Sequence, residues 1–173
     1  MRPEPEGAYR TGIYGRNRHH TPCGFESGYR NNEIARQLGN WAKNDGRGLA
    51  LDSNTEYFLP NGAAFAPDAS WVPKQRLAAF TKDRKKKFLY LCPEFVIELM
   101  SPSDRLSRAM AKMTQWMENG AALSWLIDAD RRIVYIYRPG RAPEELAEPG
   151  HVSGEGPVAG FRLKLTGIWC GLE

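Results

Sequence analysis

Residues 94–104 read EFVIELMSPSD, and this stretch decides the fold because it joins an apolar strand to the start of a helix. Glu98 stands inside the apolar run, between Ile97 and Leu99. A carboxylate that leaves water loses its solvation, so at this position it needs a pairing cation, a proton or a bound metal ion. We therefore expect the fold to bring a compensating group to Glu98.

The segment after this strand has the pattern of an amphipathic helix. Ser101 is a good N-cap, and Pro102 suits the first helical position. Apolar side chains then recur at helical spacing until Asn119-Gly120, namely Leu106, Ala109, Met110, Met113, Trp116 and Met117. With a further strand at 123–127, the pattern predicts a βαβ unit with parallel strands and a right-handed crossover.

The chain before residue 94 predicts one helix and three short strands. The helix begins at Asn31 or Asn32 and runs to about Lys43. The runs LALD and TEYFLP, separated by Ser53-Asn54, are typical of a hairpin or bent ribbon, and AFAPDASWV is a third strand. A polar connection at 73–93 completes this half.

The chain after the βαβ unit predicts a strand pair and a packed tail. ALSWLID and RRIVYIYR are apolar strands joined at Ala129-Asp130. A loop rich in Pro, Gly and Glu continues to about residue 157, and the tail packs its apolar side chains Phe161, Leu163, Leu165 and Trp169. The order of elements indicates an α/β fold, with a mixed central sheet flanked by helices.

Length and composition indicate one ordinary globular domain. At 173 residues, with 42% hydrophobic and 25% charged residues, we assign the domain to 25–173, after an irregular arm at 1–24. Three cysteines suggest buried thiols in a reducing compartment. No segment predicts a membrane span or signal peptide, so we expect a cytoplasmic protein. The net charge of +4 is compatible with a polyanionic partner.

Two acids are candidates for a metal site. Side chains alternate along a strand, so Glu98 shares its face with Val96 and Met100, near the end of a central strand. Asp68 follows a proline and begins the preceding strand. If the two strands pair, both carboxylates converge on one point, where oxygen ligands would suit Mg²⁺.

The helix after Glu98 supplies positive charge. Arg105, Arg108 and Lys112 recur at spacings of three and four residues, and Gln115 lies one further step along. Lys112 aimed at Glu98 could orient a water molecule or stabilise a developing oxyanion. Together with the two acids, this predicts metal-assisted phosphodiester hydrolysis.

Simpler interpretations stay open at this point. Glu98 and Lys112 can form a structural salt bridge, and Asp68 can be a turn residue. The basic run KDRKKK at 82–87 is either a solvated loop or a phosphate-contacting surface. The three histidines, His19, His20 and His151, have no partner at ligand spacing and are assigned no chemistry.

Several segments together resemble the bacterial family described as putative restriction endonucleases, once a domain of unknown function, within the PD-(D/E)XK nuclease superfamily. The matching stretches are NNEIARQLGNW at 31–41, DSNTEYFLPNGAAFAPD at 52–68, PDASWV at 67–72, PEFVIELMSPSD at 93–104, KMTQWMENGA at 112–121, LSWLIDADRRIVYIYRPG at 123–140 and PVAGFRLKLTGIW at 157–169. The resemblance covers roughly residues 25–170.

The resemblance implies a restriction-endonuclease-like αβββαβ core, here with an extra C-terminal strand pair, and a divalent-metal site. Asp68 matches the acid of the proline–aspartate motif, and Glu98 matches the second acid. The superfamily lysine two residues later is replaced by Met100, so Lys112 is its match on the following helix. Glu33 matches an acid that many members draw from the first helix. Its alternative role is a first-turn acid that stabilises the helix N-terminus.

Two functions therefore follow from the sequence. The first is a Mg²⁺- or Mn²⁺-dependent endonuclease acting on DNA as a homodimer, with Asp68, Glu98 and Glu33 at the metal and Lys112 in catalysis. The expected DNA contacts are Arg105, Arg108, Gln115, Lys85, Lys86 and Lys87. The second is a catalytically inactive nuclease-fold module that binds nucleic acid or assembles with a partner.

Overall fold

The computed structural model describes residues 24–172, so nearly all of the expected N-terminal arm lies outside the described residues. The helices are α1 (Phe25–Asp45), α2 (Lys74–Leu77), α3 (Leu106–Glu118) and α4 (Thr166–Cys170), with 3-10 turns η1 (Arg84–Lys86) and η2 (Gly156–Val158). The strands are β1 (Gly48–Asp52), β2 (Tyr57–Phe58), β3 (Ala64–Phe65), β4 (Ala69–Pro73), β5 (Leu89–Tyr90), β6 (Phe95–Leu99), β7 (Leu123–Asp128), β8 (Ile133–Tyr137), β9 (Glu144–Ala147), β10 (His151–Ser153) and β11 (Arg162–Lys164).

A six-stranded mixed sheet forms the centre, in the order β1-β4-β6-β7-β8-β9. Strands β6 and β7 are parallel and joined by α3, which confirms the predicted βαβ unit and its parallel pairing. Strands β7 and β8 form the predicted antiparallel pair. Strand β4 runs antiparallel to β6 on the other side, so the start of β4 lies beside the end of β6.

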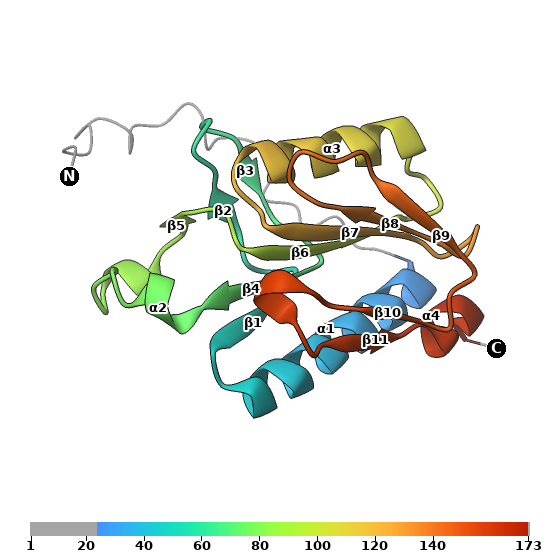
Figure 1. Ribbon diagram of the computed structural model, residues 1–173, viewed down its shortest axis with the longest axis horizontal. Helices are drawn as coiled ribbons and strands as arrows, with labels where there is room; N and C mark the ends of the chain where they lie inside the picture. The colour runs from blue at the N-terminus through green and yellow to red at the C-terminus, as the bar shows by residue number, and fades with distance from the viewer. Residues whose placement is uncertain (1–23, 173) are drawn as a thin grey trace.

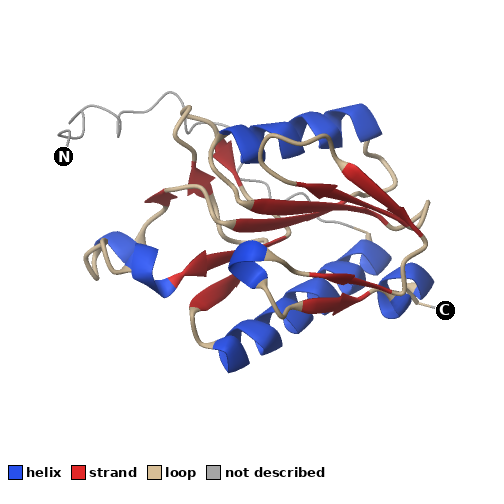
Figure 2. Cartoon of the chain, viewed as in Figure 1, coloured by secondary structure: helices blue, strands red, loops and turns tan. Residues whose placement is uncertain are grey.

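The sheet separates two apolar cores. Figure 1 and Figure 2 show α3 on one side of the sheet and α1 on the other. Alternate residues of β6 explain this arrangement. Phe95, Ile97 and Leu99 belong to the core that contains α1, whereas Val96 packs with Met113 and Trp116 of α3. The predicted α/β fold with a mixed sheet flanked by helices is confirmed.

Helix α1 begins earlier than the sequence pattern predicts, at Phe25 instead of Asn31 or Asn32. Its buried stripe starts with Ser27 and Arg30 and continues through Ile34, Leu38 and Ala42. Because two of the inward positions are polar, the first turns of α1 lack the apolar periodicity that predicts a helix. The helix ends where Gly46 adopts a left-handed conformation with φ of 75° and donates its N–H to Ala42.

The predicted start of α3 is also wrong, because the helix begins at Leu106 with Arg105 as the N-cap residue. Ser101 and Asp104 instead close a turn in front of it. The backbone N–H and the hydroxyl of Ser101 both donate to Oδ2 of Asp104, at 2.8 and 2.9 Å. The Asp104 carboxylate therefore accepts hydrogen bonds inside this turn and does not cap α3.

LALD and TEYFLP do not form the hairpin that was one of their two predicted arrangements. Strand β1 pairs with β4 in the central sheet, whereas β2 lies between β3 and β5 in a separate three-stranded sheet. The chain turns at Asp52, whose backbone carbonyl accepts from Thr55, and then leaves the central sheet. The predicted third strand is likewise divided, into β3 and β4, around Pro67, which has no N–H for a strand ladder.

The C-terminal part contains more regular structure than expected. The region predicted as a loop to residue 157 includes β9 and β10, and β10 pairs with β11 in a separate two-stranded sheet that was not predicted. Phe161, Leu163 and Leu165 are buried, as predicted for the tail. Cys92 is buried as expected, but Cys170 is exposed. No helix among residues 24–172 is both long and apolar enough to cross a lipid bilayer.

Candidate active site

Glu98 lies near the end of β6 on the face covered by α3, and only 7% of it is exposed. Oε1 of Glu98 is held by two groups of α3. The ammonium of Lys112 lies 2.7 Å from it, and the indole N–H of Trp116 donates over 2.8 Å. Because Lys112 and Trp116 are four residues apart, they lie on the same side of the helix. The compensating groups expected from the sequence are therefore present.

Asp68 reaches the same end of β6 from the neighbouring strand. The register pairs Ala69 with Ile97, so the next position along sets Asp68 opposite Glu98. Oδ2 of Asp68 accepts the backbone N–H of Leu99 over 2.7 Å, and Oδ1 accepts the side-chain N–H of Asn31 over 3.1 Å. Asp68 is thus fixed by a strand and a helix that lie far from it in the sequence.

Burial dominates the electrostatics of both acids. It raises the pKa of Glu98 to about 7, although the charge of Lys112 and the hydrogen bonds from Lys112 and Trp116 act in the opposite direction. The charge of Asp68 raises the Glu98 pKa further. Burial also raises the pKa of Asp68, and the nearby charge of Asp104 adds to this effect. The two carboxylates therefore repel each other, and one lysine compensates them incompletely.

Lys112 is accessible despite its ion pair, since 34% of its side chain is exposed. Its Nζ also lies 3.4 Å from the backbone oxygen of Ala66 and 5.8 Å from the centre of the Phe65 ring. These contacts come from the segment that leads into Asp68. The Lys112 ammonium therefore lies between Glu98 of β6 and the segment that leads into Asp68, and a ligand in solvent can contact it.

The structure does not bring Glu33 to the carboxylates. Its Oε1 lies 2.6 Å from Nη2 of Arg36 and accepts from the side-chain amide of Gln37 over 2.9 Å, and the Arg36 hydrogen bond lowers the Glu33 pKa. Glu33 is two residues beyond Asn31, which is about 200° around a helix. The helix that contacts Asp68 through Asn31 therefore directs Glu33 elsewhere, and the predicted metal role of Glu33 is not supported.

The predicted DNA-contacting residues fall into two separate groups. Arg105 and Arg108 are exposed at the start of α3, next to the loop that follows β6, and Gln115 is half-buried further along the helix. Lys85, Lys86 and Lys87 lie in or next to η1, after α2, and α2 begins where β4 ends. Because β4 is antiparallel to β6, its end lies at the opposite end of the sheet from the end of β6, where Glu98 is located. Figure 1 shows α2 at that opposite end. Their DNA contacts remain predictions.

Two contacting residues were missed as parts of the site. Trp116 was assigned to the apolar stripe, and Asn31 was considered only as a helix cap. Trp116 could have been identified from its spacing to Lys112. Residues four apart lie on the same side of a helix, so a carboxylate that contacts Lys112 can also contact Trp116. For Asn31 no comparable signal exists, since its contact depends on how α1 packs against the sheet.

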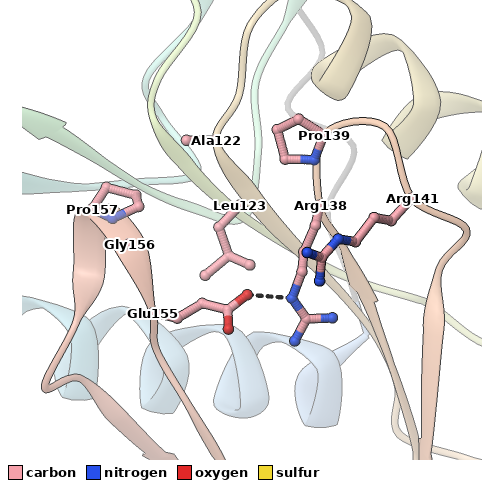
Figure 3. Close-up of a pocket in the computed structure, with 8 residues that line it drawn as sticks. All are labelled: Ala122, Leu123, Arg138, Pro139, Arg141, Glu155, Gly156 and Pro157. Atoms are coloured by element: carbon pink, nitrogen blue, oxygen red, sulfur yellow. Dashed lines mark hydrogen bonds and ion pairs between the residues drawn. The ribbon is translucent and has the colours of Figure 1, made fainter.

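The structure also contains a pocket of about 390 Å³ away from these acids, lined by residues that include Leu123, Arg138 and Glu155. Leu123 is the first residue of β7, whereas the carboxylates lie near the ends of β6 and β7. Figure 3 shows the Glu155 carboxylate directed at the Arg138 guanidinium across the pocket. Arg138 also pairs with Glu144 at 2.6 Å, so its charge is already balanced.

The donor set at Asp68 and Glu98 fits a hard divalent cation. Carboxylate oxygens are the preferred ligands of Mg²⁺ and Mn²⁺, and Mg²⁺ usually keeps several waters beside one or two carboxylates. Within residues 24–172 no group of three or more His, Cys, Asp or Glu side chains forms a complete cage. Two carboxylates with bound water would meet the preference of Mg²⁺.

Comparisons with known proteins identify the family and the fold of the chain. A family model, Uma2, described as "Putative restriction endonuclease", matches residues 3–166. The fold is similar to a solved structure described as a putative nuclease belonging to DUF820 from Anabaena variabilis, with a TM-score of 0.74, 19% identity, and coverage of 88% of this chain and 84% of that one. A search of curated proteins found no match. The chain thus belongs to the Uma2 family of putative restriction endonucleases.

Proposed function

We propose that this protein is a metal-dependent endonuclease that hydrolyses phosphodiester bonds of DNA. Asp68 and Glu98 would hold Mg²⁺ or Mn²⁺, and Lys112 would act in catalysis. One observation carries the proposal: the buried carboxylate of Glu98 and the half-buried one of Asp68 lie at the same end of the sheet, where the charge of Asp68 raises the Glu98 pKa, and an accessible ammonium is 2.7 Å from Glu98. A structural ion pair has one cation for one anion, whereas here two carboxyl groups share one lysine.

A bound divalent cation would supply Lewis-acid polarisation of the phosphate. The residues of the chain perform the remaining tasks. Asp68 and Glu98 keep their orientation because Leu99, Asn31 and Trp116 donate to them. The ammonium of Lys112 can orient a water molecule or stabilise negative charge that develops on the phosphate. Because it is partly exposed, substrate can reach it.

DNA is the proposed substrate because family membership implies a nuclease, and positive charge adjoins the site. Arg105 and Arg108 extend from the start of α3, beside the turn that leaves β6. The chain carries a net charge of +4, which favours a polyanion. We also propose a homodimer, since nucleases that cut both strands often pair their sites through two-fold symmetry. Light scattering after size-exclusion chromatography tests that proposal.

The test of function is plasmid cleavage with Mn²⁺ by the wild type, Glu98→Ala and Glu118→Gln. Glu118 is an exposed acid at the end of α3 and serves as the matched control. We expect cleavage by the wild type and Glu118→Gln, and none by Glu98→Ala. Equal products from all three proteins would identify a contaminating nuclease. Cleavage by none of them would favour the inactive binding module.

A further inference from the structure

Asn31 connects α1 to the candidate site across the sheet. Glu98, Lys112 and Trp116 meet on the α3 side, whereas α1 covers the opposite face. At the sheet end, the side-chain N–H of Asn31 donates to Oδ1 of Asp68 over 3.1 Å. An ionised carboxylate can only accept hydrogen bonds, so the amide must present its nitrogen to Asp68.

This orientation leaves the other half of the amide unsatisfied. Oδ1 of Asn31 is buried, and no donor reaches it from the described residues. A buried polar atom without a partner costs about 1–3 kcal/mol, so buried oxygens are normally satisfied by protein, water or ligand. This oxygen belongs to a side chain that touches a proposed metal ligand, so it can accept a hydrogen from a group that binds at the site.

We propose that Asn31 is a positioning residue of this site: its N–H fixes Asp68, and its Oδ1 accepts a hydrogen from a water molecule of the hydrated divalent cation. The inference rests on the proposed function and specifies how α1 contributes to it. Mg²⁺ dehydrates reluctantly, so the groups around it must bind its waters as well as the ion. Residues that orient a metal ligand commonly contribute to affinity without touching the metal.

A neutral amide suits this position better than the acid first expected from α1. Asp68 and Glu98 already repel each other, and Asp104 adds negative charge nearby. A third carboxylate beside them would increase the repulsion in the metal-free protein. Glu33, the acid in this part of α1, is instead neutralised by Arg36. Asn31 supplies both a donor and an acceptor without further charge.

The chain offers a closely matched control for the test, because Asn32 is the adjacent residue, has the same side chain and is exposed. Calorimetric titration of the full chain with Mn²⁺ compares the wild type, Asn31→Ala and Asn32→Ala. We expect Asn31→Ala to weaken Mn²⁺ binding by about 10-fold or more, as for other residues that support metal ligands, and Asn32→Ala to match the wild type.

A second readout separates positioning from a merely structural role. At one fixed Mn²⁺ concentration, the rise in Tm caused by the ion should be smaller in Asn31→Ala than in the wild type, because stabilisation by a ligand depends on its affinity. A structural role would lower the Tm equally with and without Mn²⁺. Wild-type Mn²⁺ affinity in Asn31→Ala, or the same loss in Asn32→Ala, would overturn the inference.

Failure of the proposed function gives a different result. If the wild type binds no Mn²⁺, both the metal function and the water-accepting role of Asn31 are refuted. The hydrogen bond from Asn31 to Asp68 is then tested separately, by ¹⁵N–¹H spectra of the side-chain amides in the metal-free protein. We expect Asp68→Ala to shift the Asn31 amide signals and to leave those of Asn32 in place. Unshifted Asn31 signals would refute the positioning contact as well.

Discussion

The indole N–H of Trp116 donates a 2.8 Å hydrogen bond to Oε1 of Glu98 in the layer between α3 and the sheet. The ring itself packs against Phe65 and Tyr57. Replacement by phenylalanine retains much of the ring contact but removes the donor. Since the bond stabilises the ionised carboxylate, we expect Trp116→Phe to raise the Glu98 pKa above about 7. The loss of stability should therefore be larger at pH 9 than at pH 5, by about 1–3 kcal/mol in urea unfolding.

Trp125→Phe is the control for this substitution. Trp125 is fully buried in the other core, and its indole nitrogen has no hydrogen-bond partner among the described residues. Its replacement removes similar packing without removing a hydrogen bond to an acid. The cost of Trp125→Phe should be the same at both pH values. An equal pH dependence in the two variants would show that the Trp116 bond does not support the charged form of Glu98.

Glu98→Gln should stabilise the metal-free protein at high pH. The unfolded chain ionises Glu98 near its ordinary pKa of 4.5, whereas the folded chain does so at about 7. Between these values the folded protein binds more protons than the unfolded one, so its stability falls as pH rises. The total loss is about 3 kcal/mol at about 1.4 kcal/mol for each unit of pKa.

Glutamine at position 98 cannot ionise, so Glu98→Gln avoids this loss. Urea unfolding in the presence of a chelator should show little difference from the wild type below pH 4.5 and an advantage approaching about 3 kcal/mol above pH 8. Mn²⁺ should reverse the order, because it stabilises only the protein that binds it. A variant less stable than the wild type at pH 9 without metal would contradict the raised Glu98 pKa.

The strongest sequence patterns predicted the elements that build the site. The apolar run of β6 and the helical spacing of Met113 and Trp116 identified a βαβ unit. The alternation along β6 grouped Glu98 with Val96, whose face α3 covers in the structure. Asp68 and Lys112 could be anticipated because the resemblance matched them in order and spacing. The structure brings both to Glu98, whereas their chemical roles remain a proposal.

The remaining features depend on tertiary packing that no local pattern encodes. Asn31 and Asp68 are 37 residues apart, and their contact exists only because α1 crosses the end of the sheet. The start of α1 was missed because Ser27 and Arg30 occupy inward positions. Arg30 is acceptable there since it pairs with Glu26 and Asp130, and Asp130 lies about 100 residues further along the chain. Strands β9 and β10 were missed because they are short and mostly exposed, so their sequences contain no apolar run.

Lys112→Met should remove cleavage while retaining metal binding. Methionine keeps the aliphatic stem in its contacts but lacks the ammonium that lies 2.7 Å from Glu98. Loss of one preorganised donor to developing charge typically lowers kcat by about 10²–10³-fold. Mn²⁺ affinity at pH 9 should not fall, because the repulsion between lysine and cation is also removed.

The control is Lys43→Met, which alters an exposed lysine in the last turn of α1. It should cleave plasmid at the wild-type rate. If Lys112→Met retained full cleavage, the ion pair with Glu98 would be structural, and Lys112 would have no part in catalysis. Calorimetry on the same protein shows whether any loss of cleavage arises from lost metal.

The salt dependence of DNA binding distinguishes the two predicted basic surfaces. Each phosphate contact contributes about 0.9 to the slope of log affinity against log salt concentration. Arg105 and Arg108 adjoin the loop after β6, so Arg105→Ala with Arg108→Ala should reduce this slope by about 2. Fluorescence anisotropy with a chelator measures binding without cleavage.

The lysines of the η1 segment provide the comparison. Lys86 pairs with Asp83 at 2.8 Å, and the segment follows α2 at the other end of the sheet. Replacing Lys85, Lys86 and Lys87 together by alanine should therefore reduce the slope by less than the two arginine substitutions do, even though it removes more charge. If the lysine variant lost more affinity and slope, DNA would lie along the sheet formed by β2, β3 and β5, and the start of α3 would not be the principal phosphate contact.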